Sequence, residues 1–207
     1  MTRCLTCRTA SEPFSSEGAA HVRILLIFDE IITGAGRTGR LFAAETFGVT
    51  PDVLCTAKGL SEGYAPLSAM ICRRPIADAF WGPVEENPGF VEGHTFEGNP
   101  ISCAAGLAVL REILERDLCA NARTQGERLR AGFNRLAHKY GVIGDIRGKG
   151  RLQGIEFMRD PATKAPFPAE SAFGVRVGRR ALANGLLCRF DPNWLPFGPP
   201  LVVTAEQ

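Results

Sequence analysis

The run from Arg23 to Phe28 is the feature that most constrains how this chain can fold. It is short, and after its first residue it is continuously apolar and contains two β-branched isoleucines. A strand with one solvated face alternates apolar and polar residues, whereas a parallel strand that is covered on both faces does not. The run therefore predicts a buried parallel strand and an α/β fold, and the charged pair Asp29-Glu30 ends the strand.

Further short elements are predicted up to residue 115. Asn99-Pro100 is typical of a helix start, because asparagine caps free N–H groups and proline suits the first helical position. Apolar residues then recur at helical spacing from Ile101 to Ile113. Before this helix we expect short helices at 41–47 and 75–80, strands at 53–57 and 67–72, and a loop over 82–93.

The pattern changes after residue 115. We expect a long amphipathic helix at 118–140, strands at 142–147, 152–157 and 186–190, and a helix at 171–184. Residues 21–115 are therefore predicted to form a partial large domain with a mostly parallel sheet, and residues 116–207 a smaller, incomplete α+β domain. Residues 1–20 are polar and lack periodicity, so we leave them unassigned and expect disorder.

Charge and cysteine content indicate which kinds of molecule this chain could bind. The 24 lysines and arginines nearly balance the 22 aspartates and glutamates, so the sequence does not suggest binding to nucleic acid or to a membrane. No apolar stretch is long enough to span a bilayer. The seven cysteines are scattered, and the Cys4-Cys7 pair lacks further ligands, so we expect reduced thiols and no metal site. These features predict a cytoplasmic protein that acts on small molecules.

Two glycine motifs suggest chemistries that the surrounding sequence disfavours. Gly34–Gly39 reads G-x-G-x-x-G, but a dinucleotide-binding fingerprint requires the strand to lead directly into the first glycine, and here other residues intervene. A loop whose glycines adopt positive φ is the better interpretation. Gly59–Gly63 reads G-x-S-x-G, but a nucleophile elbow needs a following helix, and Pro66 and a predicted strand follow instead. Ser61 is therefore expected to be a loop hydroxyl.

Asp29 and Lys58 each follow a predicted buried strand. In open α/β sheets ligands bind at the carboxyl ends of the strands, so this carboxylate and this amine can face one crevice. A lysine can form a Schiff base with a carbonyl cofactor, and an aspartate can keep a pyridine nitrogen protonated so that the ring accepts electrons. From the spacing alone, a structural ion pair or two unrelated surface charges is an equally good interpretation.

Several ordered segments resemble those of class III (ω-) aminotransferases, which are PLP-dependent enzymes of fold type I. Leu26–Gly39 is similar to the segment whose aspartate binds the pyridine ring of the cofactor, and Ala57–Leu67 resembles the lysine loop. His94–Pro100 resembles the segment whose threonine binds the cofactor phosphate of the neighbouring subunit. Pro199–Thr204 is similar to the C-terminal signature of the family.

The resemblance implies a homodimer, the cofactor pyridoxal 5'-phosphate and a role for each matching residue. Lys58 would hold the cofactor as a Schiff base and move the proton, and Asp29 would pair with the pyridine nitrogen. Thr95 would reach the cofactor phosphate across the dimer interface. Arg189 would bind the carboxylate of an oxo acid, for which a guanidinium is suited by bidentate pairing. Pro196 stands where ornithine-type members carry an arginine, which argues against that type.

These roles imply transfer of an amino group between an amine or amino acid and an oxo acid. A related PLP-dependent aminomutase would use the same lysine and aspartate. An inactive fragment or interaction remnant is a further alternative, because members of the family are roughly twice as long and carry the turn that holds the cofactor phosphate in the part that precedes these segments. The resemblance thus predicts a PLP-transferase type I fold whose large domain is partial.

Overall fold

The computed structural model describes residues 24–86 and 89–207, so the lead predicted over residues 1–20 lies outside the described residues. Contacts divide the described residues into two units. One comprises residues 24–36 and 40–117, and the other comprises residues 37–39 and 118–207. We call them the sheet-A unit and the C-terminal unit and describe each by itself.

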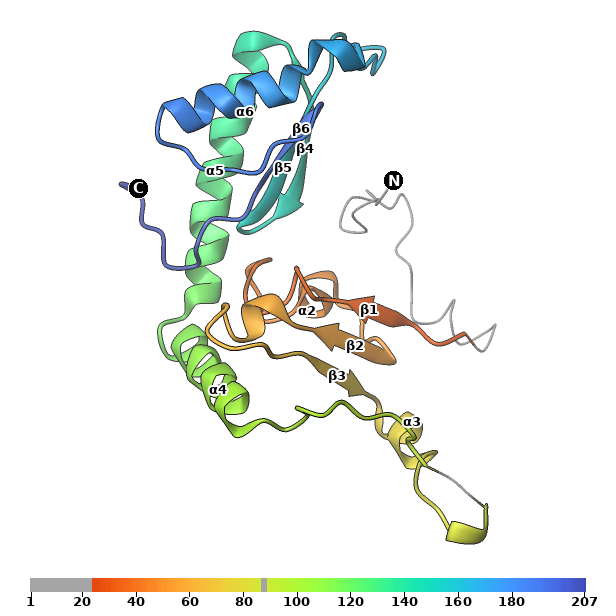
Figure 1. Cartoon of the computed structure of the whole chain (residues 1–207). Coiled ribbons are helices and arrows are strands. Elements are labelled where there is room, and N and C mark those ends of the chain that lie inside the picture. The colour runs from red at the N-terminus through yellow and green to blue at the C-terminus, as the bar shows by residue number, and fades with distance from the viewer. Residues whose placement is uncertain (1–23, 87–88) are drawn as a thin grey trace. The chain divides into compact units, whose positions relative to one another are not determined.

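The sheet-A unit is built on three strands, in the order β1-β2-β3 (Figure 1). The central strand β2 runs parallel to β1 and antiparallel to β3, and its residues Val53, Leu54 and Thr56 are buried. The strand bounds are β1 Ile27–Asp29, β2 Val53–Thr56 and β3 Ala69–Cys72, and the helices are α2 Ala43–Phe47, α3 Arg74–Asp78 and α4 Pro100–Glu115, with 3-10 turns η2 Lys58–Leu60 and η3 Val84–Glu86.

Strand β1 begins later than the apolar run predicts, and the prediction that it is buried on both faces is wrong, because Ile27 is 60% exposed. The backbone of Leu26 bonds to the start of β2: its N–H donates to the Asp52 carboxylate at 2.9 Å, and its carbonyl accepts from the N–H groups of Asp52 at 2.8 Å and Val53 at 3.1 Å. Backbone Arg73 N–H donates to the carbonyl of Asp52, so this residue ties the strand ends together. The ladder with β2 therefore starts at Ile27, opposite Val53.

Helix α4 starts where the sequence predicts. The side chain of Asn99 accepts hydrogen bonds from Ile101 N–H at 3.0 Å and from Ser102 N–H at 3.2 Å, which confirms the predicted N-cap. The buried Gly106 lets α4 approach the lysine turn, because a side chain there would collide with Leu67 and would lie 3.5 Å from the Leu60 carbonyl oxygen. α4 therefore packs directly on η2, which carries Lys58.

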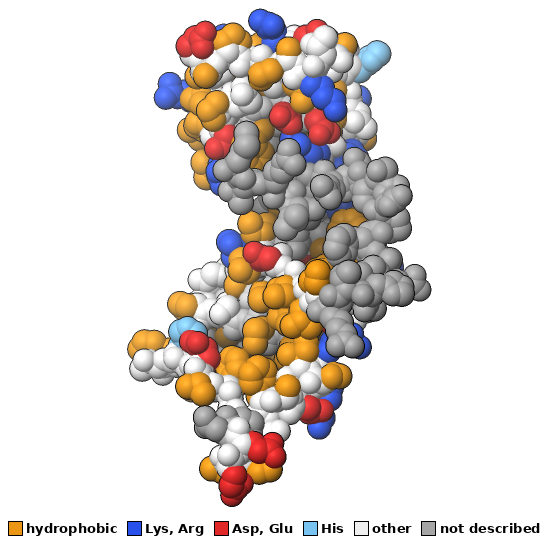
Figure 2. Space-filling view, turned by 90° about the vertical axis from the view of Figure 1, so that its right-hand side faces the viewer, with side chains coloured by type: hydrophobic (Ala, Val, Ile, Leu, Met, Phe, Trp, Pro, Cys, Tyr) orange, Lys and Arg blue, Asp and Glu red, His pale blue; other side chains and the backbone are white. Residues whose placement is uncertain are grey.

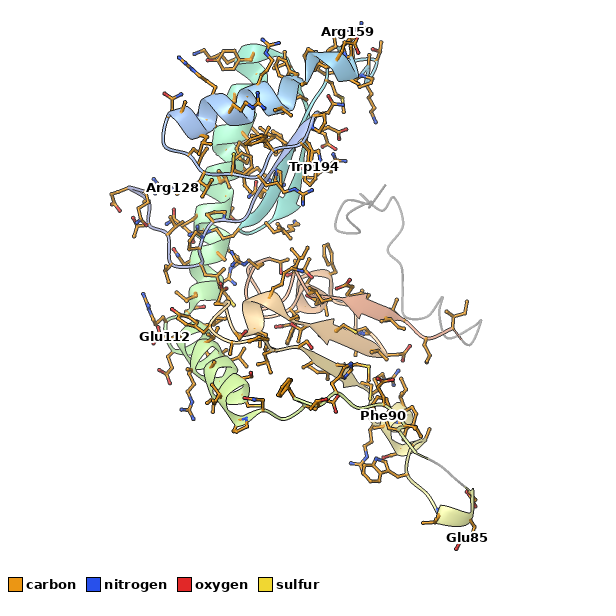
Figure 3. The ribbon with its side chains drawn as sticks, in the orientation of Figure 1. Glu85, Phe90, Glu112, Arg128, Arg159 and Trp194 are labelled. Atoms are coloured by element: carbon orange, nitrogen blue, oxygen red, sulfur yellow. The ribbon has the colours of Figure 1, made fainter. Side chains whose placement is uncertain are left out.

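Apolar side chains remain exposed in the sheet-A unit. Met70 and Ile71 are neighbours on β3 and point to opposite faces of the sheet, yet they are 55% and 52% exposed. The segment between α3 and α4 adds Phe90, whose ring stacks edge-on against Phe80 at 5.4 Å between centroids (Figure 3). Figure 2 shows hydrophobic side chains gathered on the surface of this unit. Contiguous apolar surfaces of this kind are typical of faces that pack against other polypeptide.

The C-terminal unit packs two helices on an antiparallel sheet in the order β4-β5-β6. Its core contains Phe133, Ile155, Phe157 and Leu195. The bounds are α5 Leu118–Tyr140, α6 Phe173–Ala183, β4 Ile143–Lys149, β5 Leu152–Phe157 and β6 Trp194–Phe197, with a 3-10 turn η4 at Ala169–Ser171.

The strand predicted at 186–190 is wrong, because the third strand of this sheet is β6. In the sequence, Pro192 and Pro196 argue against a strand at the position of β6, because proline cannot donate a hydrogen bond to a ladder. β6 is an edge strand, however, and an edge tolerates proline: Pro196 lies opposite Gly154 of β5. Leu186 and Leu187 remain 50% and 84% exposed, so the apolar run that suggested the strand is not buried.

Three side chains bind the main chain of residues 198–203. Arg37 donates to the carbonyls of Gly198 and Pro199, Arg151 to those of Pro200 and Val203, and Asn121 to those of Leu201 and Val203. Arg151 is 1% exposed, and burial together with the nearby Arg37 charge lowers the pKa of its guanidinium. Carbonyl dipoles therefore satisfy both terminal nitrogens of this buried cation, whereas its Nε has no hydrogen-bond partner among the described residues.

Glu30 is buried in the sheet-A unit and caps the start of α2. Its carboxylate accepts from Ala43 N–H and Ala44 N–H, both at 2.7 Å, and from the Thr33 hydroxyl at 2.9 Å. The residue is 1% exposed. A negative group at a helix start satisfies the free N–H groups and interacts well with the helix dipole.

We expect Glu30→Gln to lower the free energy of unfolding by about 1–3 kcal/mol, because an amide nitrogen cannot accept the bonds that one carboxylate oxygen now receives. Urea denaturation measures the loss. Glu45→Gln is the matched control, since Glu45 on the same helix is exposed and its amide could still accept from Phe42 N–H. Equal stabilities for the two variants would contradict a structural role of Glu30.

Candidate functional site

The carboxyl ends of β1 and β2 bring Asp29 and Lys58 to one edge of the sheet. The two strands are parallel, with Asp29 opposite Cys55, and the Glu30 N–H donates to the Cys55 carbonyl at 2.8 Å. Lys58 follows two residues after Thr56, the last residue of β2. Since a strand advances about 3.3 Å per residue, the two backbones lie on the order of 10 Å apart or less. Side chains of this length can meet around one bound molecule.

Asp29 is the available carboxylate of the pair Asp29-Glu30. Both oxygens of Glu30 are occupied by the hydrogen bonds at the start of α2. Asp29 is exposed, and within the described residues its carboxylate accepts from the Ile31 N–H alone, at 3.0 Å. One oxygen of Asp29 is therefore free to accept a bond from a ligand.

Lys58 opens the 3-10 turn η2 in an uncommon backbone conformation. Its φ is +43°, in the left-handed region, and its side chain is exposed. A non-glycine residue held there costs about 1–3 kcal/mol and persists only when its surroundings over-determine it. The turn is closed by Leu60 N–H to Ala57 carbonyl at 2.9 Å and by Ser61 N–H to Lys58 carbonyl at 3.3 Å. These bonds hold the backbone conformation from which the Lys58 side chain extends.

The two disfavoured glycine motifs form loops. Gly36 and Gly39 have φ values of +89° and +93°, as predicted for a loop that needs positive φ. The next helix, α2, begins only at Ala43, so the dinucleotide fingerprint is absent from this segment. Ser61 is 2% exposed and its hydroxyl donates to the Ala65 carbonyl at 2.6 Å, which makes it a structural loop hydroxyl.

Thr95 lies in an exposed turn just before α4. The neighbouring His94 contacts Glu97 at 3.0 Å and Glu92 at 4.0 Å. The hydrogen bond with Glu97, followed by its charge and that of Glu92, raises the pKa of His94, and the bond with His94 lowers the pKa of Glu97. Thr95 belongs to the same unit as Asp29 and Lys58. Its side chain is exposed, so its hydroxyl is accessible for a hydrogen bond with another molecule.

Arg189 belongs to the C-terminal unit, whereas Asp29 and Lys58 belong to the sheet-A unit. Its guanidinium bonds to both carboxylate oxygens of Asp191, at 3.1 and 3.3 Å, and lies 5.8 Å from the ring centroid of Trp194. The side chain is 72% exposed. Sequence reasoning missed Asp191 and Trp194, although an acid two residues from an arginine is a signal for local pairing.

The described residues were also compared with the requirements of a metal site and of a membrane-spanning helix. No group of three or more His, Cys, Asp or Glu side chains in residues 24–86 and 89–207 is arranged to hold a metal ion. In the part of the chain that the structure describes, no helix combines the length and apolar character that crossing a membrane requires.

The pair His94–Glu97 predicts a pH dependence of the turn that contains Thr95. The raised pKa of His94 means that its contribution to stability is present below the unfolded pKa of about 6.5 and is lost as pH rises through the folded value. The lowered pKa of Glu97 means that its contribution is lost as pH falls through the folded value. The pair therefore stabilises the turn between these two limits.

NMR titration tests this pair. The His94 midpoint should lie above about 6.5 and should move back toward that value in Glu97→Gln. Glu86→Gln is the control, because Glu86 has no bond to His94 among the described residues, and it should leave the midpoint in place. An unchanged midpoint in Glu97→Gln would exclude the pair.

Comparison with known proteins places the chain in a family. The family model for class III aminotransferases matches residues 17–207. An adenosylmethionine-8-amino-7-oxononanoate aminotransferase of Geobacter sulfurreducens is 40% identical, over 89% of this chain and 40% of its own length. A Bacillus anthracis aminotransferase has a TM-score of 0.85 and 35% identity, over 92% of this chain and 43% of that one.

A second solved structure is an amine transaminase from an uncultivated Pseudomonas species in its PLP-bound form, with a TM-score of 0.84 and 36% identity. It covers 92% of this chain and 43% of that chain. These likenesses confirm the predicted fold class, α/β with a partial large domain of the PLP-transferase type. The chain spans about two fifths of the length of the curated relatives it matches, and it belongs to the class III aminotransferase family.

Proposed function

We propose that this chain carries the lysine and the aspartate of a PLP-dependent aminotransferase site, which moves an amino group between an amine or amino acid and an oxo acid. The observation that carries the proposal is the parallel register of β1 and β2, which delivers Asp29 and Lys58 to one sheet edge. Membership of the family and the PLP-bound relative support pyridoxal 5'-phosphate as the cofactor.

The residues at this edge fit that cofactor. When bound, pyridoxal 5'-phosphate supplies an electron sink for the substrate carbon. The Lys58 amine would hold the cofactor as a Schiff base and, once released, would take and return the proton at the substrate carbon. The free oxygen of Asp29 would accept the bond from the pyridinium N–H and keep that nitrogen protonated.

We also propose a homodimer and two further binding residues. Thr95, exposed in its turn, would donate its hydroxyl to the cofactor phosphate of the second copy. Arg189 would bind the oxo-acid carboxylate in place of Asp191; exposed ion pairs contribute little, so a carboxylate of the substrate can replace it. A cytoplasmic location agrees with these small-molecule substrates.

The first test is the colour of the protein with pyridoxal 5'-phosphate. A Schiff base absorbs near the visible range, so the wild-type chain should show the band and Lys58→Ala should lose it. Lys164→Ala is the matched control, because Lys164 is also exposed and also has a positive φ, of +57°. A wild type without the band, or a Lys58→Ala variant that keeps it, would refute the assignment.

The second test concerns Asp29. Asp29→Asn keeps the shape of the side chain but removes the charge that stabilises the pyridinium, so the single-turnover rate of amino transfer should fall by roughly 10²–10³-fold. The Lys58 band should persist, because the lysine is unchanged. Asp78→Asn, which alters an exposed partner of Arg74 on α3, should leave the rate as it is. A wild-type rate in Asp29→Asn would show that the charge has no such role.

A further inference from the structure

We propose that Ala35 and Gly59 form a contact that positions Lys58, and that the absence of a side chain at Gly59 is required for the lysine to reach its cofactor. Gly59 directly follows Lys58, and Ala35 lies in the loop after β1. The inference rests on the proposed function, since it concerns the delivery of the same lysine amine. It assigns a role to the loop at 34–39, which has no nucleotide-binding role here.

The two residues approach as closely as their atoms permit. A Cβ on Gly59 would lie 2.9 Å from the Ala35 Cβ, closer than two such atoms tolerate. Its next neighbours, the Glu62 carboxylate and the Gly34 carbonyl oxygen, would lie at 3.6 and 3.7 Å, which are ordinary contacts. The crowding at Gly59 therefore comes from one methyl group.

The Ala35 methyl group cannot move aside. Ala35 is 2% exposed and has no side-chain rotamer to change. Its loop is fixed by bonds of Gly34 N–H to the Glu30 carbonyl at 2.9 Å and of Gly36 N–H to the Leu41 carbonyl at 3.1 Å. Gly34 in turn lies close to Thr56, since a Cβ there would meet the Thr56 hydroxyl oxygen at 3.0 Å. A side chain at Gly59 would therefore push the lysine turn and not the loop.

Ala35 and Lys58, the residue before Gly59, are both held in the left-handed region, at φ +54° and +43°. Neither conformation is favoured by its own residue, so each depends on the packing around it. On another side, Gly106 of α4 approaches the Leu60 carbonyl oxygen of the same turn. A shift of the peptide between Lys58 and Gly59 rotates the Lys58 side chain, and a misplacement of about 1 Å at a reacting atom can cost 10²-fold in rate.

The experiment compares Gly59→Ala, Ala35→Gly and the double variant. Each full chain is incubated with pyridoxal 5'-phosphate and reduced with borohydride, and mass spectrometry gives the fraction labelled at each lysine. Lys139, Lys149 and Lys164, the other lysines of the sequence, are internal references. Relative to them, labelling of Lys58 should fall about tenfold or more in Gly59→Ala and should return to within about threefold of wild type in the double variant.

Ala35→Gly alone should label like wild type, because glycine readily adopts the positive φ at this position. Gly198→Ala is the control for adding a methyl group, since a Cβ there meets nothing within 4 Å. Wild-type labelling of Lys58 in Gly59→Ala would overturn the inference. So would a double variant that regains the stability of wild type but not the labelling, because the contact would then be structural only.

A second readout does not need the cofactor. The three-bond coupling between the Lys58 amide and α protons reports its φ, which should leave the left-handed region in Gly59→Ala and return in the double variant. If the wild-type Lys58 is not labelled above the reference lysines, the proposed function fails, and this coupling still decides the inference. A φ that stays left-handed in Gly59→Ala would refute it.

Discussion

The parallel pairing of β1 with β2 is the constraint on which the candidate site depends. Parallel strands end at the same edge of a sheet, so residues that follow the two strands meet even though 29 positions separate Asp29 from Lys58 in the sequence. A slip of one residue would exchange the faces of all side chains on β1. It would turn Glu30 out of the core and Asp29 into it. The buried bonds of Glu30 to α2 oppose such a slip, so a structural carboxylate maintains the register that exposes its neighbour.

Much of the fold could be predicted because local signals agree with it. The Asn99 cap is a local interaction, and α5 has the predicted bounds because its apolar stripe repeats over many turns. The strand at 186–190 failed for the opposite reason: whether an apolar run pairs depends on which segment occupies the free edge of β5, and that is decided by distant residues. β1 is shorter than the apolar run, and no local pattern reveals the bonds of Leu26 to Asp52 and Val53 that precede it.

Some features of the candidate site could also be predicted from the sequence, and others could not. The order of strand, Asp29, strand and Lys58 is readable in the sequence, and the structure places both at one sheet edge; their chemical roles stay predictions. The sequence alone does not distinguish the two adjacent acids, because their difference lies in the N–H groups that point at Glu30. The approach of Ala35 to Gly59 is a long-range packing fact between two small residues, and such residues carry no pattern of their own. Pairing of Arg189 with Asp191 is local and could have been anticipated.

The attachment of residues 198–203 has a different kind of consequence. The hydrogen bonds that Arg37, Arg151 and Asn121 donate to this segment go to main-chain oxygens, so they recognise its path and not its amino-acid identities. The side chain of Val202, which is exposed, takes no part in these hydrogen bonds. The donors are more constrained: a lysine carries all its N–H groups on one nitrogen, so it could not reach the two carbonyls from two separate nitrogens as the planar guanidinium of Arg151 does. These hydrogen bonds thus depend on the side chains that hold the segment and not on the side chains of the segment itself.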